Sequence, residues 1–195
     1  MGNIGSLINM FQRIGAQTEV VSDLKSIGTA RKVLLPGVGA FDAAMSRIDA
    51  LGLREVLCEK ALVDKVPFLG ICLGMQLLTN SSEEGQTKGL GLIDGQTLRF
   101  PRKSCLKVPH MGWNRVETTQ ETPLTSDLPP EPRFYFVHSY YVKAADPADV
   151  MLRSTYGIDF DAGLRRGNIF GAQFHPEKSH KFGMALLKGF VSLPC

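Results

Sequence analysis

The chain has 195 residues, a length that suits one domain with a substantial core, and we expect residues 1–195 to form a single domain. Its hydrophobic content of 44% and charged content of 21% are ordinary for a globular protein. A formal net charge of +3, spread over scattered basic residues, argues against a nucleic-acid partner. No apolar run is long enough for a membrane span, and no signal-peptide pattern opens the chain.

The cysteines show neither a CxxC pair nor the spacing of metal ligands; they are Cys58, Cys72, Cys105 and Cys195. We therefore expect free thiols, a cytoplasmic location and no metal site. The basic stretch 99–107 is interpreted as a solvated loop or as a rim for an acidic partner.

The first half of the chain alternates helix and strand patterns. Helices are predicted over 4–14, 42–64 and 73–80, and strands over 18–21, 32–35 and 68–71. Repeated βα units of this kind predict an α/β fold of three layers, in which helices cover both faces of a doubly wound, mostly parallel sheet.

The second half is rich in strand patterns and closes with a helix. The strands are predicted over 90–100, 112–117, 134–142, 150–156 and 169–174, and the helix over 181–191. A doubly wound fold normally opens with a buried strand, whereas this chain enters a helix almost directly. Either the true start lies upstream of Met1, or the sheet lacks its first strand.

The most informative segment is Val66–Gln76, where a short apolar run leads into Cys72 between Gly70 and Gly74. This layout is typical of a nucleophile elbow, in which small flanking residues allow a sharp turn from strand to helix. The amides at the start of the following helix favour a thiolate there. The alternative is a buried structural cysteine, a common environment for this residue.

A cysteine nucleophile needs a base and a group that orients the base. Of the four histidines, His175 is the best candidate, because it ends an apolar strand pattern and precedes Pro176 and Glu177. Residues i and i+2 of an extended chain project to the same side, so Glu177 can reach the imidazole. An isolated His–Glu pair is more often a surface pair, but the elbow favours a catalytic one.

A glycine-containing loop, Leu35–Phe41, follows the predicted strand 32–35. Successive backbone N–H groups of Gly37, Val38 and Gly39 can face an anion, and Leu73 beside the nucleophile can supply a further N–H. These four residues are the candidate oxyanion hole, although a plain turn is the alternative. The spacing GxGxxG is absent, which argues against a dinucleotide site.

Together these segments resemble the class I (triad) glutamine amidotransferases over nearly the whole chain. The matching segments are Pro36–Phe41, Gly70–Leu78, Pro109–Asn114, Tyr135–Tyr140 and Phe174–Ser179. Pro109–Asn114 and Tyr135–Tyr140 are similar to one group in particular, the glutaminase subunits of imidazole glycerol phosphate synthases.

The resemblance implies that Cys72 is the nucleophile, His175 the base and Glu177 its orienter, and that glutamine is hydrolysed to glutamate through a thioester. It implies no cofactor and no metal. The positions that resemble glutamine-binding ones are Gln76, Glu84 and the backbone of His138, Ser139 and Tyr140. A carboxylate at Glu84 suits an α-ammonium group, although a solvated acid beside Glu83 is the alternative.

In this family the ammonia passes to a partner synthase, a (β/α)8 barrel, so the resemblance implies a heterodimer in histidine biosynthesis. The residues that resemble partner-facing ones are Asn3, Trp113, Tyr135 and Lys178. Trp113 could equally lie in the core, but an exposed aromatic residue beside a lysine suits an interface.

Two other functions remain open at this point. Similar subunits supply ammonia for the amidation of sugars in surface polysaccharides, and the acceptor is chosen by the partner. A non-enzymatic protein of the same fold could use an elbow thiol for sensing, but the set of Cys72, Gln76, His175 and Glu177 argues against it.

Overall fold

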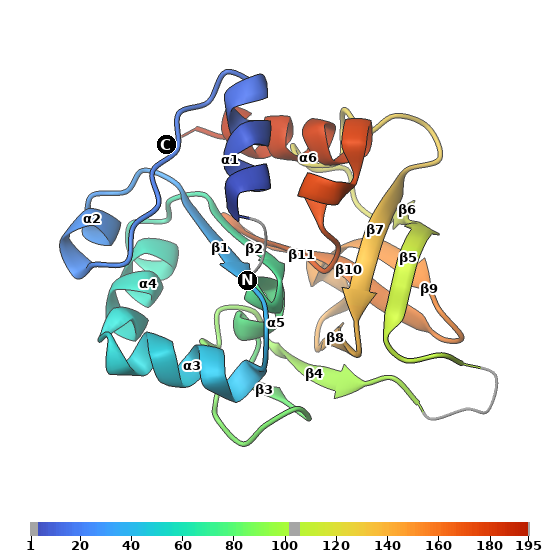
Figure 1. The fold of residues 1–195 in the computed structure, drawn as a ribbon, viewed down its shortest axis with the longest axis horizontal. Coiled ribbons are helices and arrows are strands. Elements are labelled where there is room, and N and C mark those ends of the chain that lie inside the picture. Colours follow the sequence, from blue (N-terminus) through green and yellow to red (C-terminus); the bar gives the residue numbers. More distant parts are fainter. Residues whose placement is uncertain (1–3, 102–105, 195) are drawn as a thin grey trace.

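The computed structural model describes residues 4–101 and 106–194, which form a layered α/β fold (Figure 1). Among these residues the main sheet runs in the order β1 (Val33–Gly37), β2 (Phe68–Cys72), β11 (Ile169–Ala172), β10 (Asp159–Arg166), β8 (Tyr140–Ala144), β4 (Gly95–Arg99) and β3 (Ser81–Ser82). β9 (Val150–Thr155) pairs with β10, and β6 (Glu117–Thr118) pairs with β9. A separate antiparallel pair consists of β5 (His110–Arg115) and β7 (Arg133–His138).

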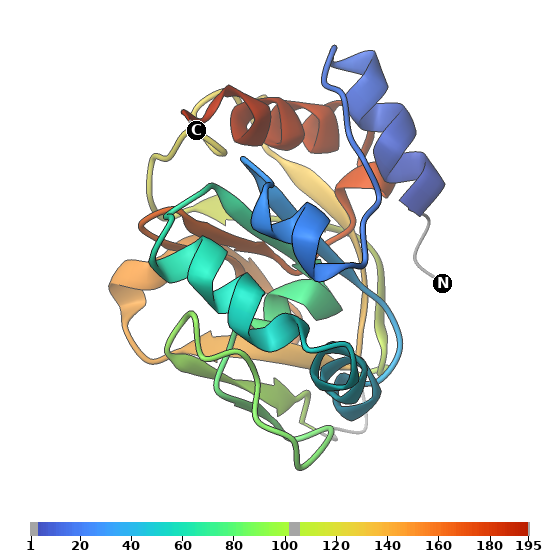
Figure 2. The ribbon, with the colours of Figure 1, turned by 90° about the vertical axis from the view of Figure 1, so that its left-hand side faces the viewer.

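Helices lie on both faces of this sheet (Figure 2). α1 (Ile4–Arg13) and α6 (His180–Ser192) lie together on one face. The other face carries α2 (Leu24–Gly28), α3 (Phe41–Ala50), α4 (Leu53–Leu62) and α5 (Leu73–Leu77). Two 3₁₀ turns, η1 (Pro147–Asp149) and η2 (Pro176–Lys178), complete the elements. Within the described residues, none of the helices combines the length and apolar character that crossing a membrane requires.

The alternation of side chains along β2 divides the core into two clusters. Leu69 and Ile71 pack with residues of α1 and α6, whereas Phe68 packs with residues of α3 and α4 on the opposite face. Every residue of β2 is buried, as expected for a strand that is covered on both faces. The predicted three-layer α/β fold is thus confirmed.

The strands that carry the candidate site are parallel. β2 lies between β1 and β11, and both pairings are parallel. Beyond β11 the sheet continues through antiparallel pairs of β10 with β11, β8 and β9. The carboxyl ends of β1, β2 and β11 therefore meet at one edge, which is where folds of this kind place their ligands.

Several predicted elements need correction. The strand expected over 18–21 is wrong: these residues form no strand, and Val20 is 63% exposed. A strand depends on pairing with a neighbour, and none of the described strands lies beside this segment. The helical region 42–64 consists of two helices, separated at Gly52, which has φ +66°. The expected strand 90–100 is limited to β4, so its first half was also wrong.

The second half contains more strands than expected. The segment 134–142 is divided between β7 and β8 at Ser139, and 112–117 between β5 and β6. β10 was not predicted, although it pairs with three other strands. Its sequence, DFDAGLRR, lacks a clear apolar–polar alternation, so periodicity did not reveal it.

Candidate active site

β2 ends at Cys72 and α5 begins at Leu73, so the cysteine occupies the turn between strand and helix. Cys72 has φ +55° and ψ −113°, a backbone conformation that is strained for any residue with a side chain. A Cβ added to Gly74 would lie 1.9 Å from the carbonyl oxygen of Leu35, and one added to Gly70 would lie 2.6 Å from that of Gly74. The two glycines therefore allow the close packing that the predicted elbow requires.

His175 and Glu177 meet at the same edge of the sheet. His175 Nδ1 lies 2.8 Å from Glu177 Oε1, and both side chains are almost completely buried. The backbone around the histidine is held by β7, since His175 N donates to the carbonyl oxygen of Tyr135 at 2.9 Å. Ser179 Oγ donates to the carbonyl oxygen of His175 and accepts from Tyr135 N. The imidazole therefore has a fixed position and one ring nitrogen already engaged.

The electrostatic state of His175 depends on its two partners. Burial lowers the pKa of this imidazole, but interactions with Cys72 and Glu177 outweigh burial and raise the pKa to about 9. Nε2 is buried and has no partner within ordinary hydrogen-bond limits among the described residues, yet Cys72 raises the pKa of the ring most, through a loose hydrogen-bond contact and through charge. Such contacts often tighten only when substrate is bound.

The loop after β1 lies directly beside the elbow. Gly37 is paired with Cys72 in the parallel register, and a Cβ on Gly37 would lie 2.5 Å from Gly74 N. Val38 is 44% exposed and Gly39 has φ +96°, so the loop turns outward after this contact. Leu73, the first residue of α5, faces the same loop. The structure thus places Gly37 and Leu73 beside the cysteine and Val38 in the lining of the cavity that His175 also borders, whereas no contact joins Gly39 to the elbow among the described residues.

A cavity of about 60 Å³ adjoins this arrangement. Its lining includes Val38, His175 and Glu177, together with Ile4 and Leu7 of α1. That volume is enough for about two water molecules. The cavity touches both titratable groups of the His–Glu pair, whose Nε2 and Oε2 atoms are buried without partners among the described residues.

Glu84 lies at the far end of the same loop. Its Oε2 accepts from Phe41 N at 2.8 Å, at the first residue of α3. Asp42 accepts in return from Gln86 N and Thr87 N, which ties α3 to the segment that carries Glu84. Glu84 is therefore not simply a solvated acid: it stabilises the start of a helix beside the candidate oxyanion loop.

Gln76 lies one helical turn after the cysteine and is 5% exposed. Its Nε2 donates to the carbonyl oxygen of Tyr140 and to Gln173 Oε1, both at 3.1 Å. Gln173 Nε2 in turn lies 4.0 Å from Cys72 Sγ. Sequence reasoning missed Gln173, although a polar residue two positions before His175 in an apolar strand pattern was a usable signal.

His138 is buried, and both of its ring nitrogens have hydrogen-bond partners. Its Nδ1 lies 2.7 Å from the carbonyl oxygen of Tyr140, and its Nε2 lies 2.9 Å from His110 Nδ1. Burial lowers the pKa of His138 to about 3 and that of His110 to about 4. Ser139 joins β7 to β8, and its carbonyl oxygen accepts from Phe100 N. The three positions 138–140 therefore form one fixed corner next to Gln76.

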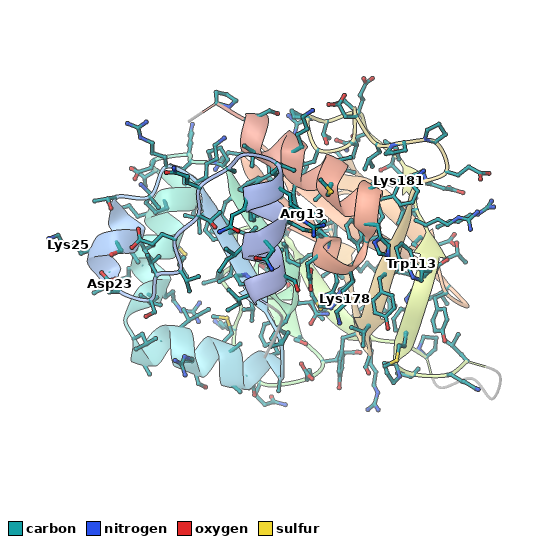
Figure 3. The ribbon with its side chains drawn as sticks, turned by 45° about the horizontal axis from the view of Figure 1, so that its top comes forward. Arg13, Asp23, Lys25, Trp113, Lys178 and Lys181 are labelled. Atoms are coloured by element: carbon teal, nitrogen blue, oxygen red, sulfur yellow. The ribbon has the colours of Figure 1, made fainter. Side chains whose placement is uncertain are left out.

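The residues that resemble partner-facing ones cluster on β5, β7 and η2. Trp113 is 47% exposed and lies opposite Tyr135 in the β5–β7 register. Lys178 Nζ lies 5.4 Å from the centre of the Tyr135 ring, and His180 stacks on Trp113 with ring centres 5.6 Å apart. Figure 3 shows Trp113, Lys178 and Lys181 near one another on this face. Asn3 lies outside the described residues.

Other predicted features are only partly described. Cys105, Cys195 and part of the basic stretch 99–107 lie outside the described residues, whereas Cys58 and Cys72 are free thiols. Over residues 4–101 and 106–194, no three His, Cys, Asp or Glu side chains are grouped as metal ligands.

Comparison with known proteins agrees with this geometry. The family model described as glutamine amidotransferase class-I matches residues 1–192. The chain belongs to this family.

Among curated relatives, the chain is 50% identical over 193 residues to imidazole glycerol phosphate synthase subunit HisH 2 of Pseudomonas aeruginosa, covering 99% of this chain and 96% of the relative. It is 48% identical over 191 residues to the protein of the same name from Methanococcus maripaludis, covering 98% and 95%. Among solved structures, a glutamine amidotransferase superposes with a TM-score of 0.76 at 15% identity, covering 97% of this chain and 93% of that one. At that identity the structural likeness shows the fold alone.

Proposed function

We propose that the chain is the glutaminase subunit of an imidazole glycerol phosphate synthase, with Cys72, His175 and Glu177 as its catalytic residues. The proposal depends on one observation: a cysteine on a strained elbow lies at the same sheet edge as a buried His–Glu pair, whose Nδ1 and Oε1 atoms are 2.8 Å apart. The relatives named as subunits of that synthase, at 48–50% identity over nearly the whole chain, support the same choice.

The geometry suits hydrolysis of a carboxamide. Cys72 Sγ attacks the side-chain carbonyl carbon of glutamine, and the oxyanion is stabilised by backbone N–H groups of the loop 37–39 and of Leu73. As the C–N bond breaks, His175 gives its proton to the leaving nitrogen, and ammonia departs from a thioester. His175 then takes a proton from water, which attacks the thioester and releases glutamate and the thiolate. Glu177 keeps the imidazole oriented and stabilises its charged form.

Around the reacting atoms, we assign the α-ammonium group of glutamine to Glu84 and the rest of the substrate to Gln76 and the 138–140 corner. Glu84 is within reach because it is tied to the start of α3, beside the oxyanion loop. Gln76 and the Tyr140 carbonyl already share a hydrogen bond, so they form one preorganised wall.

The test of the catalytic assignment is Cys72→Ala, assayed for glutamate release with the cyclase subunit present. We expect activity below detection while the complex still forms. Cys58→Ala is the matched control, since Cys58 is also a free thiol and lies away from the elbow on α4. Retained glutaminase activity in Cys72→Ala would refute the role of this thiol.

We further propose a heterodimer with a (β/α)8-barrel synthase in the cytoplasm, docked on the face of Trp113, Tyr135 and Lys178. The face adjoins η2, so a partner there lies next to the catalytic Glu177. Co-purification with the barrel, and amination of its nucleotide substrate by glutamine, is the expected result. Binding that survives Trp113→Ala combined with Lys178→Ala would place the interface elsewhere.

A second acceptor chemistry is the alternative. The two relatives described above both carry the number 2 in their names, which indicates more than one such subunit in each of those organisms. A second copy is free to supply ammonia to another acceptor, such as a sugar for a surface polysaccharide. The barrel protein that co-purifies with the chain, and the acceptor that it aminates, distinguish the two functions.

A further inference from the structure

A fully buried glutamine lies beside the proposed nucleophile and has no part in the reaction above. Gln173 directly follows β11 and is 0% exposed. Its Nε2 lies 4.0 Å from Cys72 Sγ, and its Oε1 accepts from Gln76 Nε2 at 3.1 Å. Because a buried amide is costly unless its polar atoms are paired, these contacts constrain how Gln173 is oriented.

The orientation follows from the hydrogen-bond acceptor at the other side of Gln76. The carbonyl oxygen of Tyr140 can only accept, so Gln76 must turn its NH₂ group toward it. The same NH₂ group faces Gln173, which must therefore present its oxygen to Gln76. The NH₂ group of Gln173 is then the end that faces the sulfur of Cys72.

The Tyr140 carbonyl is itself held by a buried pair of imidazoles. His138 Nδ1 donates to it at 2.7 Å, so the carbonyl has a donor on each of its two lone pairs. A neutral His138 then accepts at Nε2 from His110 Nδ1, 2.9 Å away. His110 Nε2 is 3.3 Å from Asn114 Nδ2, which also donates to the carbonyl oxygen of Thr155.

Each hydrogen bond in this series has only one possible donor and one possible acceptor while both imidazole rings are neutral. Burial lowers the pKa of His138 to about 3 and that of His110 to about 4, which keeps both rings neutral at pH 7. The rings are also fixed by packing, since His110 stacks between Phe136 and Tyr156 with centroid distances of 4.9 and 4.0 Å. The His138–His110 end of this hydrogen-bond series is therefore rigid.

We propose that Gln173 is a positioning residue that donates an N–H to the thiolate of Cys72, held in that orientation through Gln76, the Tyr140 carbonyl and the His138–His110 pair. The inference rests on the proposed glutaminase function. Gln173 exchanges no proton, which distinguishes it from His175. Its hydrogen bond stabilises the charged sulfur before attack and weakens when the sulfur becomes a neutral thioester.

The test is Gln173→Met, which keeps the side-chain volume and removes the N–H donor. We expect the pH midpoint for alkylation of Cys72 by iodoacetamide to rise by about one unit. With the cyclase subunit present, kcat at pH 7 should fall about tenfold, and the loss should shrink as the pH rises, because a thiolate then forms without help. A merely structural defect would lower the rate at every pH.

Gln96→Met is the matched control, since Gln96 is exposed on β4. The inference is overturned if Gln173→Met folds, does not shift the pH midpoint for alkylation, and keeps kcat within twofold of that of the unaltered chain. If the variant does not fold, the unaltered chain labelled with ¹⁵N-glutamine decides. The Gln173 side-chain amide resonances should then move over the pH range in which Cys72 becomes reactive, and fixed resonances overturn the proposal.

The two proposals fail in different ways. Full glutaminase activity in Cys72→Ala would refute the catalytic assignment itself. An inactive Cys72→Ala combined with an unaffected Gln173→Met would refute only the positioning role.

Discussion

Two buried imidazole sites in this molecule have different partners, and their pKa values move in opposite directions. His175 is 5% exposed and contacts a carboxylate, and its pKa is raised to about 9. His138 is 6% exposed and contacts another imidazole and a carbonyl group, and its pKa is lowered to about 3. Burial alone disfavours the charged ring, whereas an anionic partner reverses the sign.

The difference separates a site that can exchange protons from one that can only hold a structure. The His175 ring can hold a proton near neutral pH, because Cys72 and Glu177 stabilise its charged form, and the proposed reaction uses this proton. The His110–His138 pair stays neutral, so its hydrogen bonds keep one direction. Four predictions use this contrast.

The largest effect is expected from Glu177→Gln, which removes the charge and keeps the shape. His175 should then resemble His138, with a pKa below 9 that approaches or passes its ordinary value. Glutamate release with the cyclase subunit should fall on the order of 10²- to 10⁴-fold. An NMR titration of His175 and a steady-state assay measure the two effects, with exposed Glu121→Gln as control. A pKa that stays near 9 would show that the carboxylate is not the cause.

Acid should lower the stability of the fold, because the buried, neutral imidazoles of His110 and His138 oppose protonation. The folded pKa values of His110 and His138 lie below the unfolded value of 6.5, so the unfolded chain binds more protons as the pH falls. The stability that they provide is present above pH 6.5 and is lost below it. Between pH 7 and pH 5 we expect a loss of about 4 kcal/mol in the free energy of unfolding, measured in urea. In His110→Gln the pH slope should be about half as steep, and parallel curves would contradict this.

Alkali should also lower the stability of the fold, in this case because His175 is charged in the folded chain and loses its proton at high pH. Its folded pKa of about 9 lies above the unfolded value of 6.5, so its contribution is complete below pH 6.5 and is lost as the pH rises through 9. Between pH 7 and pH 9 the expected loss is about 2 kcal/mol. Cys72→Ala should reduce this loss, because the thiol is one of the two partners that raise the pKa. Equal alkaline slopes in both chains would refute the coupling.

The smallest effect on folding is expected at Trp113, where the fourth imidazole, His180, stacks on the exposed indole ring. Trp113→Ala should change the free energy of unfolding by less than about 1 kcal/mol, because the ring is half exposed. Affinity for the barrel partner should fall about tenfold or more. Calorimetric titration measures the affinity, and Leu51→Ala, an exposed apolar residue between α3 and α4, is the control.

Sequence patterns predicted correctly those features that are formed by residues close together in the sequence. The run before Cys72 and the glycines beside it predicted a strand, a sharp turn and a helix, and β2 and α5 occur there. The i, i+2 relation predicted that Glu177 reaches His175. Both features involve residues within a few positions of each other, so the local backbone geometry of one segment determines them.

The errors occur where pairing between distant segments decides. Residues 18–21 carry a strand pattern but pair with none of the described strands, whereas β10 has a weak pattern but pairs with three of them. Gln173 and Cys72 are 101 positions apart, and His110 and His138 are 28 apart. Such contacts exist only after the sheet has assembled.

The sequence by itself determined the thiol at the elbow, the contact between His175 and Glu177, and the family to which the chain belongs. The tertiary structure alone decided that the buried ring of His138 faces another imidazole, His110, and that Gln173 lies beside Cys72. The physical reason is that a histidine's charge depends on the groups within a few ångströms of its ring, and folding brings those groups together from distant parts of the chain.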